Sequence, residues 1–341
     1  RVHYTLSGRD SSTLALAQIV STAAELARST YSSLGWLTPP PDAGSGGLDP
    51  DTTYDIYIID IDSLRPNHLA VQGSTRPDAP YSGSYPNGIS SWIEIDRDLD
   101  QSFWLQGIIP DDSLMMAFTA HEVAHAVQGR YRDFPDRRAE GVPGYDSLWY
   151  YENCAVFMEE LVYDNMNTLS RVFLPLFDGG LNPLTYTRHG IDWGNTLYTG
   201  ALWPIFLEEN YGPNTVRKTW EKMGSIPGNN VIATIDSSLT QNHSSSLREA
   251  LKQYAVWRFF TGTRADAYHF SEGATYPTSI ELATHSNYYF IDTQDPYVPV
   301  TRGGMNFFIL SGTPPALYIN FNGNEVIDWD VIVIGFRSGA I

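Results

Sequence analysis

The first third of the chain combines one helical hydrophobic period with several strand-like runs. Apolar residues recur at roughly helical spacing over about residues 12–32, which predicts a helix with one apolar face. The segments 54–60 and 91–96 are rich in β-branched and aromatic residues or alternate apolar with polar ones, so we expect two strands. Residues 3–6 can form a short opening strand, and the Pro- and Gly-rich stretch 38–47 predicts a loop.

The middle of the chain changes to a helical period. Five helices are predicted there, over residues 111–129, 148–165, 195–211, 214–223 and 246–260. We expect Pro204 to kink the third helix, because proline removes a backbone hydrogen bond from a helix interior. Ser246 and Glu249 have the spacing of a capping box, which predicts the start of the last helix.

Beyond about residue 275 the pattern changes again, to short apolar runs separated by Gly, Pro and Asn. These runs predict strands over residues 288–291, 306–310, 316–321 and 329–334. Strands of that length and spacing are typical of a small β-sandwich-like domain. The whole pattern predicts an α+β protein with an N-terminal α/β part (1–110), a helical part (111–272) and a C-terminal β-rich domain (273–341).

Composition and charge narrow the range of partners. The 341 residues are 42% hydrophobic and carry a formal net charge of -18. A field of that sign repels a phosphate backbone, so we expect no nucleic-acid binding. No apolar run reaches the roughly 18 residues of a membrane-spanning helix, so we expect no membrane span. Cys154 is the single cysteine, which excludes an intrachain disulfide.

The chain begins at Arg1 rather than at methionine. We interpret this start as the result of signal-peptide cleavage, with or without loss of a propeptide, and expect a secreted, extracellular protein. Abundant Asn, Ser, Thr, Tyr and Gly with a single cysteine favour a bacterial exported protein, because small secreted domains of animals commonly depend on disulfides. We expect the protein to be a monomer.

The clearest chemical signal is the H-E-x-x-H motif formed by His121, Glu122 and His125 inside a predicted helix. Histidines four positions apart lie on one helical face, so both imidazoles can bind one metal ion. Zinc suits imidazole nitrogen, lowers the pKa of a bound water to about 7, and leaves Glu122 placed to take its proton as general base. The alternative interpretation is that these three side chains pack in the core without a metal. It is disfavoured, because burying three polar side chains together without a metal is costly.

A third ligand has to come from elsewhere in the chain. In a metzincin the motif would continue to a glycine and a third histidine, but Gln128 and Tyr131 stand at those positions, which excludes that class. Glu152 lies among aromatic and small residues of the next predicted helix, where an inward carboxylate needs a partner. Glu159 shares that face and is a candidate as ligand or as support for a histidine. Asp192 is a further candidate.

These residues resemble those of gluzincin-type zinc metallopeptidases, in particular a group of secreted bacterial metalloproteases. The similarity covers most of residues 1–265, and its most specific part is the H-E-x-x-H motif. The resemblance implies a zincin-like catalytic domain with one catalytic zinc bound by His121, His125 and Glu152. It also implies hydrolysis of protein or peptide substrates with Glu122 as base. The matching segments are 39–42, 54–60, 121–128, 149–155, 158–160 and 198–204.

Two further residues stand where gluzincins often place a group that stabilises the oxyanion. Tyr198 and His189 are the candidates, and the alternative interpretations are a packed aromatic residue and a surface histidine. The strand predicted over residues 92–96 precedes the active-site helix and alternates cleanly. We interpret it as an edge strand on which an extended peptide substrate pairs.

Other interpretations of the chain stay open. It could be a non-catalytic surface or adhesion protein that retains a zincin core and binds glycan or cell wall through its C-terminal strands. It could also be an O-glycopeptidase, which cleaves glycosylated but not bare substrates. A Ca²⁺ site is unsupported, because the carboxylates of residues 96–100 lack the central glycine and terminal glutamate of a calcium loop.

Overall fold

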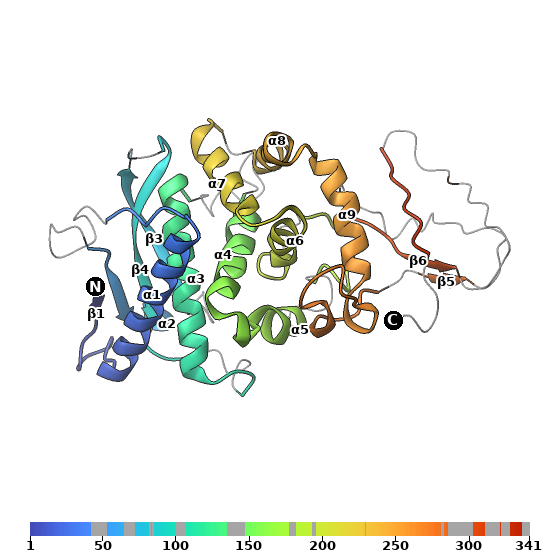
Figure 1. The fold of residues 1–341 in the computed structure, drawn as a ribbon. Coiled ribbons are helices and arrows are strands. Elements are labelled where there is room, and N and C mark those ends of the chain that lie inside the picture. Colours follow the sequence, from blue (N-terminus) through green and yellow to red (C-terminus); the bar gives the residue numbers. More distant parts are fainter. Residues whose placement is uncertain are drawn as a thin grey trace.

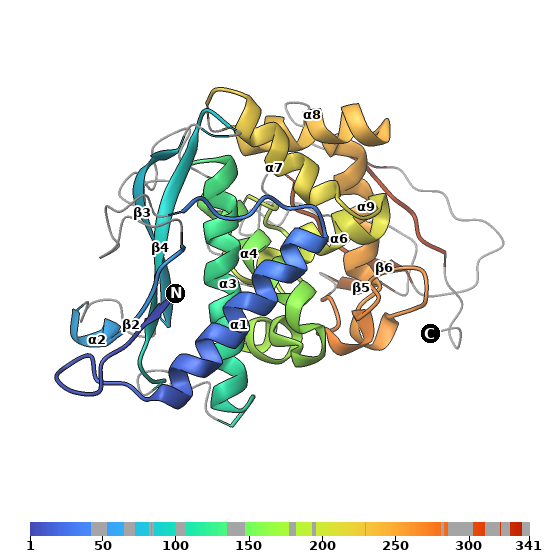
Figure 2. The same ribbon diagram turned by 60° about the vertical axis from the view of Figure 1, so that its left-hand side comes forward.

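The computed structural model of the chain is a mixed α/β protein, shown from two sides in Figure 1 and Figure 2. A small sheet lies at one end, and most of the helices lie on one side of it. This arrangement agrees with the α+β class predicted from the sequence. The structure describes residues 1–41, 53–64, 72–81, 83, 85–99, 107–134, 147–176, 182–192, 196–228, 230–280, 283–285, 303–310, 321 and 328–335.

The sheet has four strands in the order β1-β2-β4-β3. Their bounds are β1 Val2–His3, β2 Ile56–Ile59, β3 Gly73–Tyr81 and β4 Gly88–Asp96. Strands β1, β2 and β4 run parallel, and β3 is antiparallel to β4. Ile58 of β2 is in register with Ile95 of β4, and both are buried, whereas Tyr57 and Glu94, which precede them and are also in register, are partly exposed. One face of the sheet therefore supplies apolar side chains to the core.

The edge of the sheet is β3 rather than β4, because β4 pairs with β2 on one side and with β3 on the other. The prediction that residues 92–96 form an edge strand is therefore wrong. Sequence patterns missed β3, which contains Pro77 and Pro80, since proline argues against a central strand. Proline is tolerated at an edge, where the missing N–H can face solvent, and the register with β4 shifts between these two residues.

The other N-terminal elements follow the sequence prediction. The strands predicted at 54–60 and 91–96 are confirmed as β2 and β4, and the helix predicted at 12–32 is confirmed as α1, Leu14–Ser33. Thr13 caps α1, because its hydroxyl accepts a hydrogen bond from a backbone N–H of the first turn. The opening strand predicted at residues 3–6 is confirmed only at His3, because β1 consists of Val2–His3 and these two residues pair with β2.

Helix α3, Asp111–Tyr131, lies between the sheet and α4 (Figure 1). It contacts β3 and β4 of the sheet, and α1, α4 and α7 among the helices. From Leu114 onward side chains on all of its faces are buried, as expected for a helix that has neighbours all round. The helix begins after Pro110, and the acidic Asp111 and Asp112 lie in its first turn, where the helix dipole favours negative charge.

Helices α4 to α9 lie on the side of α3 away from the sheet (Figure 1), and of these α4 and α7 contact it. Their bounds are α4 Leu148–Tyr163, α5 Leu174–Leu176, α6 Leu202–Tyr211, α7 Thr215–Ser225, α8 Val231–His243 and α9 Leu247–Phe259, while the short α2, Ile61–Leu64, follows β2. A 3-10 turn at Thr199–Ala201 leads into α6. None of the helices formed by the described residues has the length and apolarity needed to cross a bilayer.

Four predicted helices are confirmed within a few residues: 111–129, 148–165, 214–223 and 246–260. Ser246 caps α9 as predicted, since its hydroxyl accepts a hydrogen bond from the backbone N–H of Glu249. The helix expected over 195–211 begins only at Leu202, so Pro204 lies in its first turn. A proline there removes no intrahelical hydrogen bond, and the expected cause of a kink is absent.

The C-terminal part of the described chain contains one pair of short parallel strands. β5, Ala283–His285, pairs with β6, Phe308–Leu310, which confirms part of the strand predicted at 306–310. The strand predicted at 288–291 and all but the last residue of that predicted at 316–321 lie outside the described residues. Of the predicted β-sandwich, the structure therefore describes only this pair.

The strand predicted at 329–334 is wrong. Residues 328–335 pair with no strand of the described chain, and ion pairs from Arg248 to Asp328 and Asp330 link this segment to α9. Its alternating sequence suits a strand, but alternation alone does not supply the neighbouring backbone that a ladder requires.

Candidate metal centre

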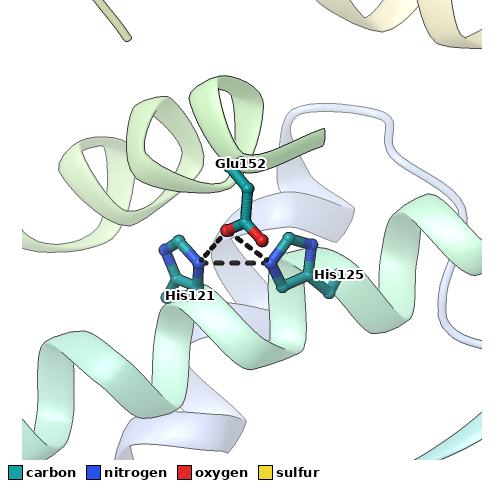
Figure 3. A group of neighbouring side chains, drawn as sticks. All are labelled: His121, His125 and Glu152. Carbon is teal, nitrogen blue, oxygen red and sulfur yellow. Dashed lines mark hydrogen bonds and ion pairs between the residues drawn. The ribbon is translucent and has the colours of Figure 1, made fainter. Parts of the chain in front are cut away.

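Two helices bring the candidate ligands together in the core (Figure 3). His121 and His125 are one turn apart on α3, so their rings project from the same face of that helix. Glu152 comes from α4, which packs against α3 and directs this carboxylate at both rings. All three side chains are buried, and Glu152 is only 2% exposed.

The three candidate ligand atoms form a compact triangle. The Nε2 atoms of His121 and His125 are 3.1 Å apart, and Oε2 of Glu152 lies 3.2 Å from the first and 3.3 Å from the second. Zinc binds nitrogen and oxygen at about 2.0–2.1 Å, so two ligands of a tetrahedral ion are about 3.3–3.4 Å apart. The observed separations and donor types therefore fit a small tetrahedral metal ion.

Gln128 fixes the tautomer of His125. Its side-chain N–H donates to the backbone oxygen of Tyr151 at 3.0 Å, so its Oε1 faces Nδ1 of His125 at 2.9 Å. An amide oxygen can only accept, and Nδ1 must therefore carry the proton of a neutral ring. The lone pair is left on Nε2, the atom that points at the triangle, as a metal-binding histidine requires.

Glu159 supports His121 from the other side of its ring. Its Oε2 lies 3.5 Å from Nδ1 of His121, whereas Glu152 faces Nε2. The hydroxyl of Thr168 donates to Glu159 and lies within hydrogen-bond distance of Glu160 as well. Among the described residues, the group that can hold an ion includes neither Glu159 nor Asp192.

Charge is distributed unevenly over the ion-free cluster. Burial raises the pKa of Glu152, but the charge of His125 and the hydrogen bonds of both histidines outweigh it and hold that pKa well below its usual value. Burial likewise lowers the pKa of His121, yet hydrogen bonds to Glu152 and Glu159 raise it to about 10. His121 thus holds a proton that a metal ion would have to displace on binding.

Glu122 is held by the edge strand. The hydroxyl of Thr75 on β3 lies 2.7 Å from Oε2 of Glu122 and 2.9 Å from its backbone oxygen. Gly73 packs against the same side chain so closely that a Cβ there would lie 2.6 Å from Cγ of Glu122. Sequence reasoning missed both contacts, because β3 was not predicted and no local spacing connects these residues to the motif.

The two candidate oxyanion residues lie in different surroundings. The ring of Tyr198 is centred 6.0 Å from that of His121 and stacks on Phe173 at 5.3 Å, so this tyrosine borders the candidate metal centre. His189 stacks on Tyr186 at 4.8 Å and lines a small cavity beside α6 and α9. Burial lowers the pKa of His189.

Comparison with known proteins found no relative of this chain. No family model matches the chain, and no curated protein is similar enough in sequence to count as a relative.

Proposed function

We propose that the protein is a secreted zinc-dependent endopeptidase with a zincin-like, gluzincin-type centre. The observation that carries this proposal is the triangle of two imidazole nitrogens and one carboxylate oxygen beside Glu122. A His₂Glu set with a glutamate next to the first histidine is typical of catalytic zinc in peptidases. The proposal includes the division of the chain into three parts, with boundaries after residues 110 and 272.

Each protein group has a defined part in the proposed hydrolysis. A bound zinc would act as a Lewis acid that lowers the pKa of a water molecule and polarises the substrate carbonyl. Glu122 would act as the general base that accepts a proton from the attacking water and as the acid that returns it to the leaving amine. Thr75 holds the carboxylate of Glu122 in position through its hydrogen bond, and Gln128 keeps His125 in the tautomer with a free Nε2.

Tyr198 is the better-supported of the two oxyanion candidates. Its ring borders His121, at 6.0 Å between centroids, and Phe173 holds its plane. A phenol donor at that border can stabilise negative charge that develops on the carbonyl oxygen. His189, by contrast, makes its described ring contact with Tyr186.

The edge strand β3 is the proposed docking site for peptide substrates. Strand addition supplies main-chain hydrogen bonds that do not depend on the substrate sequence. Gly73 and Thr75 of this strand touch Glu122, so a peptide paired along this part of β3 would pass close to the general base. Residues 92–96 cannot take this part, because β3 and β2 already flank them.

Metal analysis combined with peptide cleavage tests the proposal. Purified protein should contain about one zinc per chain and cleave a denatured protein substrate. Glu122→Gln should keep the zinc and lower kcat by roughly 10²- to 10⁴-fold, because general acid–base catalysis contributes about that factor. Glu25→Gln is a matched control, since Glu25 is an exposed glutamate on α1.

Three outcomes would contradict the endopeptidase. Zinc without cleavage of any substrate would favour a non-catalytic protein that retains the centre. Cleavage restricted to glycosylated substrate would favour an O-glycopeptidase. Cleavage that Glu122→Gln leaves unchanged would show that the activity does not come from this centre.

A further inference from the structure

A small cavity lies beside the segment that leads into α6, away from the three candidate ligands. Gly200, Trp203 of α6, and Tyr254 and Arg258 of α9 are among its lining residues, and its volume is about 10 Å³. A cavity needs roughly 10–15 Å³ to hold one water-sized particle. The space therefore suits a single small occupant rather than a substrate or cofactor.

Arg258 brings a positive charge to this cavity. Its side chain is almost completely buried, donates one hydrogen bond to the backbone oxygen of Pro183, and lies over the ring of Tyr254 at 5.3 Å. Within the described part of the chain, its Nε–H has no hydrogen-bond partner and no carboxylate lies near enough to influence its pKa, which burial lowers. A buried cation without a counter-charge is strongly unfavourable.

Trp203 adds a second donor to the same space. Its indole is 1% exposed, and within the described chain its Nε1–H has no hydrogen-bond partner. An indole nitrogen can only donate, so whatever satisfies it must be an acceptor. The described residues that line the cavity carry no carboxylate. Two residues with unpartnered donors, one of them a cation with no carboxylate near it in the described part of the chain, therefore line a space that a single acceptor can fill.

We propose that this cavity binds one monatomic anion, chloride in an ordinary saline medium, between Arg258 and Trp203. A water molecule would satisfy the two N–H groups but would leave the charge of Arg258 uncompensated. An anion does both, and the volume of the cavity favours a halide over larger polyatomic anions. The proposal is independent of the endopeptidase function: of the residues considered for catalysis, only His189, the less supported oxyanion candidate, is among the described lining residues.

The bound anion is expected to stabilise the region behind the candidate metal centre. Gly200, which lines the cavity, also packs against the side chain of Asn153, the neighbour of Glu152 on α4. Neutralising Arg258 should therefore stabilise the packing of α6 and α9 together with the turn that contacts α4. The effect should appear as a change in the unfolding temperature, so it can be measured without an activity assay.

Thermal unfolding of the full 341-residue chain tests the proposal. Chloride is titrated against gluconate at constant ionic strength, because gluconate is too large to enter. We expect Tm to rise with chloride and to saturate. Trp203→Phe removes only the indole donor and should weaken chloride binding about tenfold or more, as expected for loss of a hydrogen bond to a charged group.

Two further variants sharpen the result. Arg258→Met should abolish the chloride response, and Trp203→Phe keeps the test decisive if that variant does not fold. Trp220→Phe is the matched control, because Trp220 is equally buried but stacks on Tyr150 and does not line the cavity. Its chloride response should equal that of the unmodified protein.

Anomalous diffraction from crystals grown in bromide locates the anion directly. A peak between Nε of Arg258 and Nε1 of Trp203 would support the site. A Tm that is the same in chloride and gluconate would overturn the proposal. So would equal responses of Trp203→Phe and Trp220→Phe, or bromide bound only elsewhere, and the cavity would then hold water.

Discussion

Thr75 connects the edge strand to Glu122, the proposed general base, through one hydroxyl group. Thr75→Val keeps the shape of the side chain but removes the hydrogen bond to Oε2 of Glu122. A hydrogen bond to a charged group contributes about 1.5–3 kcal/mol, so we expect kcat to fall roughly 10- to 100-fold. Because Thr75 does not contact the three candidate ligands in any described hydrogen bond, zinc content should not change. Steady-state kinetics and metal analysis of the purified variant measure both quantities.

Thr75→Ser is the control for that experiment, because serine retains the hydroxyl and loses only a methyl group. It should keep most of the activity. If Thr75→Val had an unchanged kcat, the hydroxyl would have no part in positioning Glu122 for catalysis. The hydrogen bond between Thr75 and Glu122 would then only hold β3 against α3.

At the residue scale, the sequence predicts side chains that are related by local spacing. His121, Glu122 and His125 follow from the period of one helix, and Glu152 follows from an inward carboxylate in a run of apolar residues. The contact of Gln128 with His125 was also accessible, since the two residues are three positions apart on α3. Thr75 was not, because its contact with Glu122 joins segments 47 positions apart.

The turn before α6 approaches α4 so closely that it requires a glycine. A Cβ on Gly200 would lie 2.4 Å from the nearest side-chain atom of Asn153, which is buried. Gly200→Ala should therefore push the turn away from α4 and destabilise the protein by about 1–3 kcal/mol, the usual cost of overpacking. Chemical denaturation measures this loss, and the zinc affinity should fall because Glu152 adjoins Asn153.

A second substitution distinguishes this clash from a general intolerance of the turn. Asn153→Ala removes the atoms that the new methyl group would meet, so the double variant should recover much of the stability that Gly200→Ala loses. Purely additive effects of the two substitutions would mean that they do not interact, and the close contact would then not be the cause.

Elements with a clear hydrophobic period were predictable, and elements without one were not. Helices α1, α3 and α4 match their predicted segments within a few residues. Helix α8 was missed, because Ser, Thr and Asn occupy much of Val231–His243 and have weak helix propensity. Strand β3 was missed because its prolines suit only an edge, and edge position is a property of the sheet rather than of the strand.

For the molecule as a whole, zinc affinity should depend on pH in a direction fixed by His121. Contacts with Glu152 and Glu159 outweigh the effect of burial and raise the pKa of His121 to about 10, so in the ion-free protein the ring is protonated at neutral pH. A metal ligand must be deprotonated. Each zinc ion therefore displaces a proton, and the affinity should fall about tenfold for each unit that the pH falls between about 8 and 6.

The ion-free protein should respond to pH in the opposite sense. The folded pKa of His121 exceeds its ordinary value of 6.5, so the stability it contributes is complete below about pH 6.5 and is lost as the pH rises toward 10.

The proton that zinc displaces from His121 can be measured by zinc titrations in buffers with different ionisation enthalpies. An affinity that did not change with pH would show that His121 does not bind the metal as a neutral ring.

The class of the fold was accessible from the sequence, but its assembly was not. One helical period, several strand-like runs and a helical middle section predict an α+β protein. The strand order β1-β2-β4-β3 depends on pairings between distant segments, which the pattern within each segment does not encode. The predicted strand at 329–334 failed for the same reason, since its pattern says nothing about whether a neighbour is present.

The burial of α3 on all its faces from Leu114 onward has a consequence for how the chain can be shortened. The sheet covers one side of this helix, and α4 and α7, which come later in the chain, cover the opposite side. A nascent chain that ends at residue 134 already contains both histidines, Glu122 and the strands β1 to β4. It nevertheless lacks Glu152 and exposes an apolar helix face to water, so such a fragment should self-associate instead of forming the candidate metal centre.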